Sequence, residues 1–178
     1  MRFLKIKSVP ILFWSAPRPL TLRPPVISVV ILVIGLVIFG LGEALLIASG
    51  AGVSPWTVLA EGVSILTGWS IGLATFVIST FVLLAWMPLR QTPGIGTILN
   101  IIIISVVLDL ALPFMPQFDS YGLRLAEAAA GVIVTGIGGG IYLIANLGPG
   151  PRVRLMTGLQ RLTGLPIAAV RSAIEISV

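Results

Sequence analysis

Few side chains in this chain can do acid–base, nucleophilic or metal chemistry. Its 178 residues contain no Cys and no His. A disulfide, a thiolate nucleophile, a Cys/His zinc site and an imidazole base near pH 7 are therefore excluded. We expect a protein that is not an enzyme, with no catalytic residue, no cofactor and no metal site.

Two Pro-containing motifs place polar side chains at the start of a short predicted helix. The first is SPWT at 54–57, and the second is GPRVR at 150–154. Ser54 is a favoured N-cap, and Pro suits the first helical position. A helix N-terminus carries free N–H groups and a partial positive charge, so each motif predicts a place for an anionic group. Arg152 and Arg154 would strengthen the second place.

Charged residues that fall within apolar runs each cost several kcal/mol unless they are paired or hydrated. Arg171 and Glu175 are four residues apart, so they share a helix face and can form a structural ion pair, which we favour over a transport role. For Glu43 and Asp109, hydration at the outer interface is an equal alternative. The candidate residues for a solute site or polar pathway are Ser54, Thr57, Arg152, Arg154, Glu43, Asp109, Arg171 and Glu175.

The composition indicates an integral membrane protein. Hydrophobic residues make up 57% of the chain and charged residues 10%, against about a quarter charged in soluble domains. A bilayer core about 30 Å thick needs roughly 20 apolar helical residues. Open β structure would leave backbone groups unpaired in lipid. We therefore predict an all-α, polytopic helical membrane protein with spans at 26–49, 69–87, 95–114 and 125–147.

The basic residues predict orientation rather than nucleic-acid binding, because they are scattered among turns and not gathered on one face. Lys and Arg accumulate on the cytoplasmic side of membranes. A cytoplasmic N-terminus places most of the 11 basic residues on that side: Arg2, Lys5, Lys7, Arg18, Arg23, Arg90, Arg152, Arg154 and Arg161. Residues 1–25 are then a basic cytoplasmic arm, which either lies on anionic lipid or serves as a topology signal.

The chain aligns with itself after a shift of 96 residues. Twelve identities, many of them Gly, Pro and Thr-Gly, fall without a gap between positions 35 and 78. A first repeat, 26–115, holds three spans and a short helix, 55–67. A second and incomplete repeat, 122–178, holds a span at 125–147, a short helix at 151–163 and a partial span at 165–178. Because three spans are an odd number, the second copy begins on the opposite side of the membrane, which is the inverted-topology repeat of many secondary transporters.

Each short helix is too short to cross a bilayer, because 13 residues reach about 20 Å. A re-entrant helix is one interpretation. The other is an amphipathic helix at the interface, with Trp56 and Trp69 as headgroup anchors. Both interpretations stay open, since a buried Arg pair without a partner would be costly.

Six linked motifs resemble a known family: GVSPWTVLAEGVSILTGWSIG, WMPLRQTPGIGTILN, VVLDLALP, GIYLIANLGPGPR, LMTGLQRLTG and VRSAIEI. From about residue 35 onward the chain is similar to the YczE/YyaS/YitT family of bacterial polytopic membrane proteins. The resemblance implies about six spans and a molecular function that is uncertain and sometimes suggested to be transporter-like. It supplies no catalytic residues.

The chain departs from that family at two levels. Members often carry an acidic residue where this chain has Thr57 and Val153, and a Gly where it has Arg154, so a cation or proton site of relatives would be lost or altered here. The repeat also predicts a sixth span at 191–210, beyond Val178. On this basis we expect a truncated member or a fragment, either impaired or completed by pairing with another chain.

Two functions fit these features. One is a secondary transporter or exporter of a small solute, with anions the favoured class, framed by the short helices. The other is a non-transporting membrane accessory or scaffold protein that uses Gly-lined faces and the basic arm. The expected partners are the lipid bilayer, a small-molecule solute and further copies in a homo-oligomer, and nucleic acid is not among them.

Overall fold

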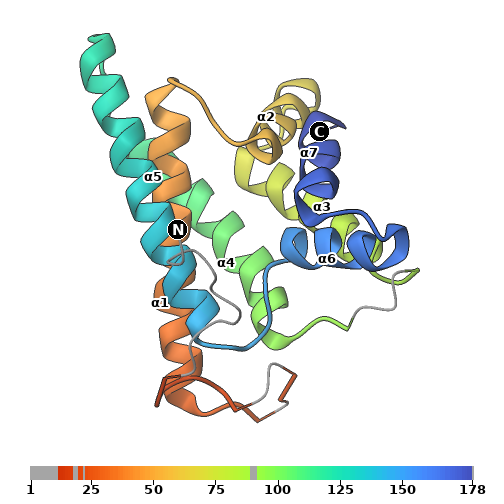
Figure 1. The fold of residues 1–178 in the computed structure, drawn as a ribbon. Coiled ribbons are helices and arrows are strands. Elements are labelled where there is room, and N and C mark those ends of the chain that lie inside the picture. Colours follow the sequence, from red (N-terminus) through yellow and green to blue (C-terminus); the bar gives the residue numbers. More distant parts are fainter. Residues whose placement is uncertain (1–11, 18–19, 22, 89–91, 178) are drawn as a thin grey trace, which may run out of the picture.

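The chain folds into helices joined by short connections (Figure 1). The structure, a computed structural model, describes residues 12–17, 20–21, 23–88 and 92–177. The predicted basic residues Arg2, Lys5, Lys7, Arg18 and Arg90 lie outside these ranges. The helices are α1 (Val26–Ser49), α2 (Pro55–Thr67), α3 (Ile71–Leu84), α4 (Ile95–Ala111) with a 3-10 turn η1 (Leu112–Phe114), α5 (Tyr121–Ile144), α6 (Pro151–Thr163) and α7 (Ile167–Ser177).

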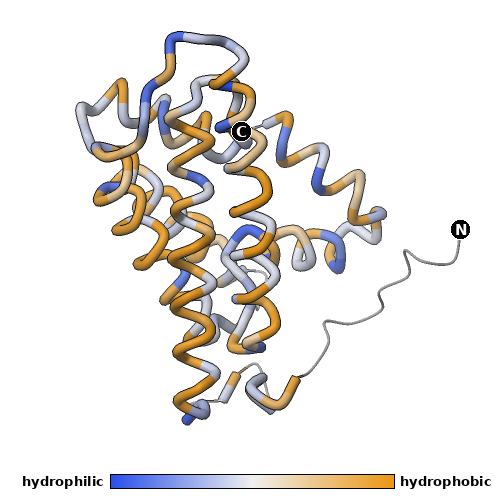
Figure 2. The backbone as a smooth tube through the Cα atoms, turned by 90° about the vertical axis from the view of Figure 1, so that its left-hand side faces the viewer, coloured by the Kyte–Doolittle hydropathy of each residue, from blue (hydrophilic) through white to orange (hydrophobic). Residues whose placement is uncertain are grey.

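Three of the described helical segments are long and apolar enough to cross a bilayer: α1, α4 with η1, and α5. The pair α2 and α3 forms a fourth candidate, bent by 116°. Figure 2 shows that hydrophobic residues predominate along the long helices. The prediction of an all-α membrane protein is confirmed.

The helix α3 is shorter than the predicted span 69–87. It begins after Ser70, whose side chain accepts a hydrogen bond from the Leu73 amide, and has 14 residues, or about 21 Å. Since this is less than a bilayer core, α3 alone does not reach across. Together with α2 it forms either one broken span or a re-entrant pair of helices.

The short helices α2 and α6 have the bounds that their capping residues predict. The Ser54 side chain accepts from the Thr57 amide at the start of α2. Gly68 and Gly164, with φ of 74° and 68°, end α2 and α6 in the left-handed conformation, which Gly adopts without a Cβ clash. The local sequence is thus sufficient to start and stop both helices.

Helices α1 and α5 are antiparallel and touch through glycines. Gly42 lies against the Thr135 backbone, and Gly138 lies against the backbone of Phe39 and Gly35. Further along, Gly35 meets Tyr142 and Gly131 meets Leu46. Small residues permit such close approach in lipid, where dispersion contacts hold helices together. The α1–α5 pair forms one wall of the molecule, on which α4 packs (Figure 1).

The second wall consists of α2, α3, α6 and α7. Helix α4 packs against α1 on one side and against α3 and α6 on the other. Within the second wall α3 contacts α6 and α2 contacts α7. The apolar core centres on the first wall and α4, with Leu32, Leu36, Ile104 and Leu108 buried together. The ends of α2 and α6 are thereby held against the long helices.

Within the described part of the predicted arm, residues 12–17 are hydrogen-bonded to the rest of the protein. The Ala16 amide donates to the Ala145 carbonyl at 3.0 Å, and Asn146 Nδ2 donates back to the Ala16 carbonyl at 2.8 Å. Ser28 Oγ donates to the Trp14 carbonyl at 2.6 Å. Ala16 is fully buried. These hydrogen bonds therefore connect the start of α1 to the end of α5. Neither sequence interpretation of the arm predicted this role.

A pair of glycine variants in α5 tests the helix contact. A Cβ at position 138 would collide with the Phe39 backbone, whereas one at position 136 would meet nothing within 4 Å. We expect Gly138→Ala to destabilise the fold by about 1–3 kcal/mol, as overpacking does. Gly136→Ala, by helix propensity, should be neutral or stabilising by up to about 1 kcal/mol. Thermal unfolding of the purified protein in detergent measures both, and equal effects would contradict this contact.

Candidate functional site

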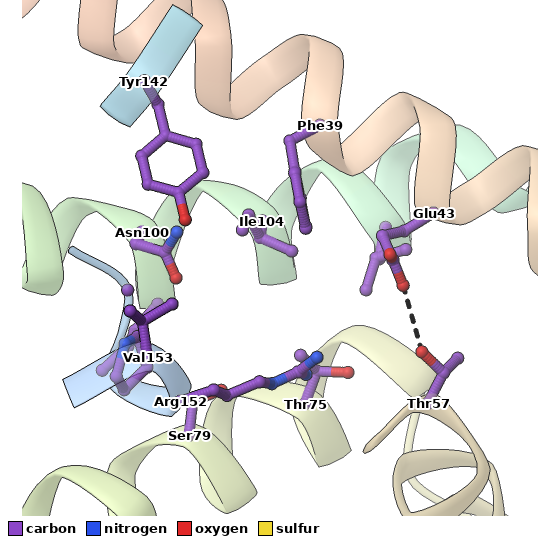
Figure 3. Close-up of a pocket in the computed structure, with 14 residues that line it drawn as sticks. Phe39, Glu43, Thr57, Thr75, Ser79, Asn100, Ile104, Tyr142, Arg152 and Val153 are labelled. Atoms are coloured by element: carbon purple, nitrogen blue, oxygen red, sulfur yellow. Dashed lines mark hydrogen bonds between the residues drawn. The ribbon is translucent and has the colours of Figure 1, made fainter. Parts of the chain in front are cut away.

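A cavity of about 220 Å³ lies where α2 and α6 meet the long helices (Figure 3). Six helices contribute to its lining, and their polar side chains point into it (Figure 3). These are Glu43, Thr57, Thr75, Ser79, Asn100, Tyr142 and Arg152. Phe39, Ile101, Ile104 and Leu108 supply an apolar side. The cavity has room for about seven waters at roughly 30 Å³ each, so it suits a small solute.

Glu43 is the acidic side chain of the cavity and is 8% exposed. Its Oε2 accepts a hydrogen bond from Thr57 Oγ1 at 3.0 Å. Because the Thr57 hydroxyl donates its proton to Glu43, the Ser54 hydroxyl donates to Thr57 across 2.8 Å. This chain of hydrogen bonds ties α1 to the first turn of α2. Glu43 Oε1 has no hydrogen bond to a described residue, so it can accept one from a solute.

Arg152 is the basic side chain of the cavity. It is the second residue of α6, is half-buried, and has its guanidinium carbon 5.2 Å from the centre of the Trp56 ring. Such a cation–π contact is worth about 0.5–2 kcal/mol. The guanidinium makes no hydrogen bond or ion pair with a described residue. Its fork of N–H donors is therefore free to hold a carboxylate or phosphate at the α6 N-terminus.

Three buried polar side chains line the cavity without a hydrogen bond of their own to a described residue. Thr75 and Ser79 are each 6% exposed, and Asn100 is 8% exposed. Buried polar groups almost always have a partner. The three side chains are therefore able to bind water or a polar solute in the cavity.

Arg154 lies outside the cavity, although the sequence predicts it beside Arg152. Its guanidinium carbon is 6.0 Å from the centre of the Trp86 ring, and Nη1 donates to the Thr92 carbonyl at 3.4 Å. Trp86 Nε1 in turn donates to the Pro151 carbonyl at 3.1 Å. These contacts fix the start of α6 against the α3–α4 connection. Arg154 therefore helps to position the helix that carries Arg152.

The structure also places Asp109 away from the cavity. Asp109 Oδ2 accepts from Ser70 Oγ at 2.7 Å, and Oδ1 accepts from the Gly72 amide at 2.8 Å. The carboxylate of α4 thus satisfies free donors at the start of α3. This contact between two helices explains why an apolar helix carries a charge at this position.

Arg171 and Glu175 form the ion pair that their spacing predicts, with Nε to Oε1 at 2.7 Å. Their side chains are 65% and 31% exposed, and both lie within α7. The pair therefore does not connect two helices, and the structure does not bring it to the cavity.

Sequence reasoning missed four polar residues of the cavity: Thr75, Ser79, Asn100 and Tyr142. One available signal was the four-residue spacing of Thr75 and Ser79 within an apolar helix, which puts both on one face. Of the predicted residues, Glu43, Thr57 and Arg152 meet at the cavity, and Ser54 touches it through Thr57.

Comparison with known proteins places the chain in a family. Residues 26–178 match a family of unknown function, DUF6198. The chain belongs to this family. A relative from Bacillus subtilis, the uncharacterized membrane protein YczE, is 30% identical over 146 residues, covering 81% of this chain and 68% of its own. The sequence resemblance to YczE-type proteins is thereby confirmed, and the chain is a membrane protein.

A second relative is an uncharacterized protein from Haemophilus influenzae. It is 38% identical over 174 residues, which cover 98% of this chain and 79% of the relative. No solved structure matches the chain significantly.

Single Cys variants test whether the cavity is reached by water. The chain has no Cys of its own, so the background is free of labelling. Ser79 lines the cavity, while Ser28 is fully buried and does not line it. We expect Ser79→Cys to react with a small water-soluble thiol reagent at least ten-fold faster than Ser28→Cys in detergent-purified protein. Equal rates in the two folded variants would rule out a wet cavity.

Proposed function

We propose that this protein is a polytopic secondary transporter or exporter of the bacterial cytoplasmic membrane, and that the cavity holds its solute. The observation that carries the proposal is the Arg152 guanidinium, which makes no hydrogen bond or ion pair with a described residue, in a cavity where Thr75, Ser79 and Asn100 also have no hydrogen bond to a described residue. Charge within a membrane protein is costly and marks solute or ion sites. The proposed role is binding and passage of a solute, without catalysis.

The position of Arg152 favours a solute with an anionic group. The α6 N-terminus adds free backbone donors and a partial positive charge to the guanidinium. Pro151 has no N–H, but Arg152 and Val153, whose amides belong to this first turn, both line the cavity. In this proposal Arg152 and the first turn of α6 hold the anionic group, while Thr75, Ser79 and Asn100 replace its hydration.

The packing of the helices supports an inverted repeat, which would make the transport mechanism one of alternating access. Under the 96-residue shift, Gly35 corresponds to Gly131, and their respective contacts Tyr142 and Leu46 also correspond. Equivalent helices α1 and α5 thus pack antiparallel through equivalent residues.

The second wall repeats this symmetry. Helix α3 contacts α6, and its counterpart pairing, α7 with α2, also occurs. Asn146 and Gly50, which are equivalent under the shift, both have φ of 56°. A two-fold axis in the membrane plane accounts for these coincidences. The 116° bend between α2 and α3 supports the re-entrant interpretation of α2.

A scaffold role remains a second candidate because of the outer face of α5. Gly136 and Gly140 lie one helical turn apart, and a Cβ at either would meet nothing within 4 Å. Such a face suits close approach of another transmembrane helix, from a partner protein or from a second copy in a homo-oligomer.

Flux through liposomes separates the two candidates. We expect purified protein to move small anionic or zwitterionic solutes, and Arg152→Ala to lower this flux at least ten-fold, since a lost charge-assisted hydrogen bond costs about 1.5–3 kcal/mol. Arg161→Ala, on the exposed end of the same helix, should leave the flux unchanged. Absence of flux for all tested solutes, together with a partner that co-purifies stoichiometrically, would favour the scaffold.

Labelling in whole cells tests the proposed orientation. With a cytoplasmic N-terminus, the α1–α2 and α4–α5 connections face outward, so Ala51→Cys and Asp119→Cys should react with a membrane-impermeant thiol reagent. Arg23→Cys, before α1, should react only after the cells are permeabilised. The inverted repeat also requires Ser54 and Gly150 to be reached from opposite sides, and reactivity of Cys variants at both positions from one side would overturn it.

A further inference from the structure

We infer that the solute is a small zwitterion of the amino-acid type, whose carboxylate binds Arg152 and whose ammonium group binds Glu43. This inference rests on the proposed transport function. Two opposite charges line one cavity, which combines them with neutral polar groups and an apolar side. The class of solute follows from how these groups are distributed.

The two charged groups face the same space and attract each other across it without direct contact. Arg152 and Glu43 both line the cavity (Figure 3), and the structure gives no ion pair between them. Arg152 is held from one side by the Trp56 ring, and Glu43 is held by Thr57. Each charged group can therefore still bind a solute in the cavity.

A solute with a single charge satisfies only one of the two charged residues. A simple anion at Arg152 would bring a like charge into the small cavity that Glu43 lines, and a simple cation at Glu43 would do the same to Arg152. Like charges in a medium of low dielectric constant repel strongly. A solute that carries both charges satisfies both residues at once, so the cavity discriminates in favour of a zwitterion.

The neutral lining of the cavity can bind both ends of a zwitterion. Asn100 is 8% exposed and has no hydrogen bond to a described residue, so its amide can both donate to a carboxylate and accept from an ammonium group. Thr75 and Ser79 add two hydroxyls. On the apolar side, Ile101 and Ile104 can contact a short aliphatic side chain. The cavity volume of about 220 Å³ is below the roughly 300 Å³ at which drug-sized pockets begin, which limits the solute to a small amino acid.

Matched probes test this inference without any variant. L-valine, its deaminated analogue isovalerate and its decarboxylated analogue isobutylamine share the branched four-carbon group. Valine carries both charges, isovalerate only the negative charge and isobutylamine only the positive charge. We expect valine, or glycine or alanine in the same assay, to bind the full-length purified protein at least ten-fold more tightly than either single-charge analogue. Isothermal calorimetry in detergent measures the affinities. Equal or tighter binding of isovalerate, or no binding of any zwitterion at millimolar concentration, would overturn the inference.

Two isosteric variants assign the ends of the solute. Glu43→Gln keeps an acceptor for Thr57 but removes the charge, so we expect it to weaken zwitterion binding at least ten-fold and to strengthen isovalerate binding. Arg152→Gln should weaken binding of both zwitterion and isovalerate, and should strengthen isobutylamine binding. Glu175→Gln, in the exposed ion pair of α7, is the control and should change none of the three. Variants that lower all affinities in parallel would contradict the assignment.

Binding and flux fail in different ways. If zwitterions bind with the expected selectivity but do not cross liposomes, the inferred ligand class stands and the transport function is wrong. If liposomes accumulate isovalerate and zwitterions neither compete nor cross, transport stands and the ligand class is wrong.

Discussion

The close contact of α1 with α5 sets the geometry on which the rest of the molecule depends. Glycines on both helices remove the side chains that would hold the backbones apart, at Gly42 against Thr135 and at Gly138 against Phe39. In lipid this contact depends on close van der Waals packing of the two helices, because burial of apolar surface contributes little free energy to their association. Its antiparallel register brings Glu43 of α1 and Tyr142 of α5 to one cavity, and α4 closes that wall.

The cavity keeps its charges by giving each one a partial partner. Trp56 supports Arg152 through its ring face, and Thr57 supports Glu43 through a hydrogen bond. Both supports come from the first turn of α2. Partial support lowers the cost of charge inside the membrane protein without using up the donors and acceptors that a solute needs. Ser54, as the N-cap of α2, therefore contributes to the site by fixing the helix start.

Charges in apolar helices serve two purposes here, and the sequence does not distinguish them. Asp109 and Glu43 are both single acidic residues in long apolar segments. Asp109 accepts hydrogen bonds from Ser70 and Gly72 and so caps a neighbouring helix, whereas Glu43 faces the cavity. The difference depends on which groups a helix distant in the sequence places beside each carboxylate. Composition and spacing describe one helix and carry no information about that neighbour.

The sequence by itself determined the membrane class and the bounds of the short helices, because apolar length, Ser54 before Pro55 and Gly68 at the helix end act over a few residues. Tertiary structure decided which polar groups share the cavity. Arg152 and Arg154 are the same residue type and lie two positions apart, so on an α-helix a rotation of about 200° about the helix axis separates their side chains. One of them meets Trp56 and the cavity, and the other meets Trp86. Helical periodicity requires the two side chains to diverge, but the packing of α6 against α3 and α4 selects which one faces the solute.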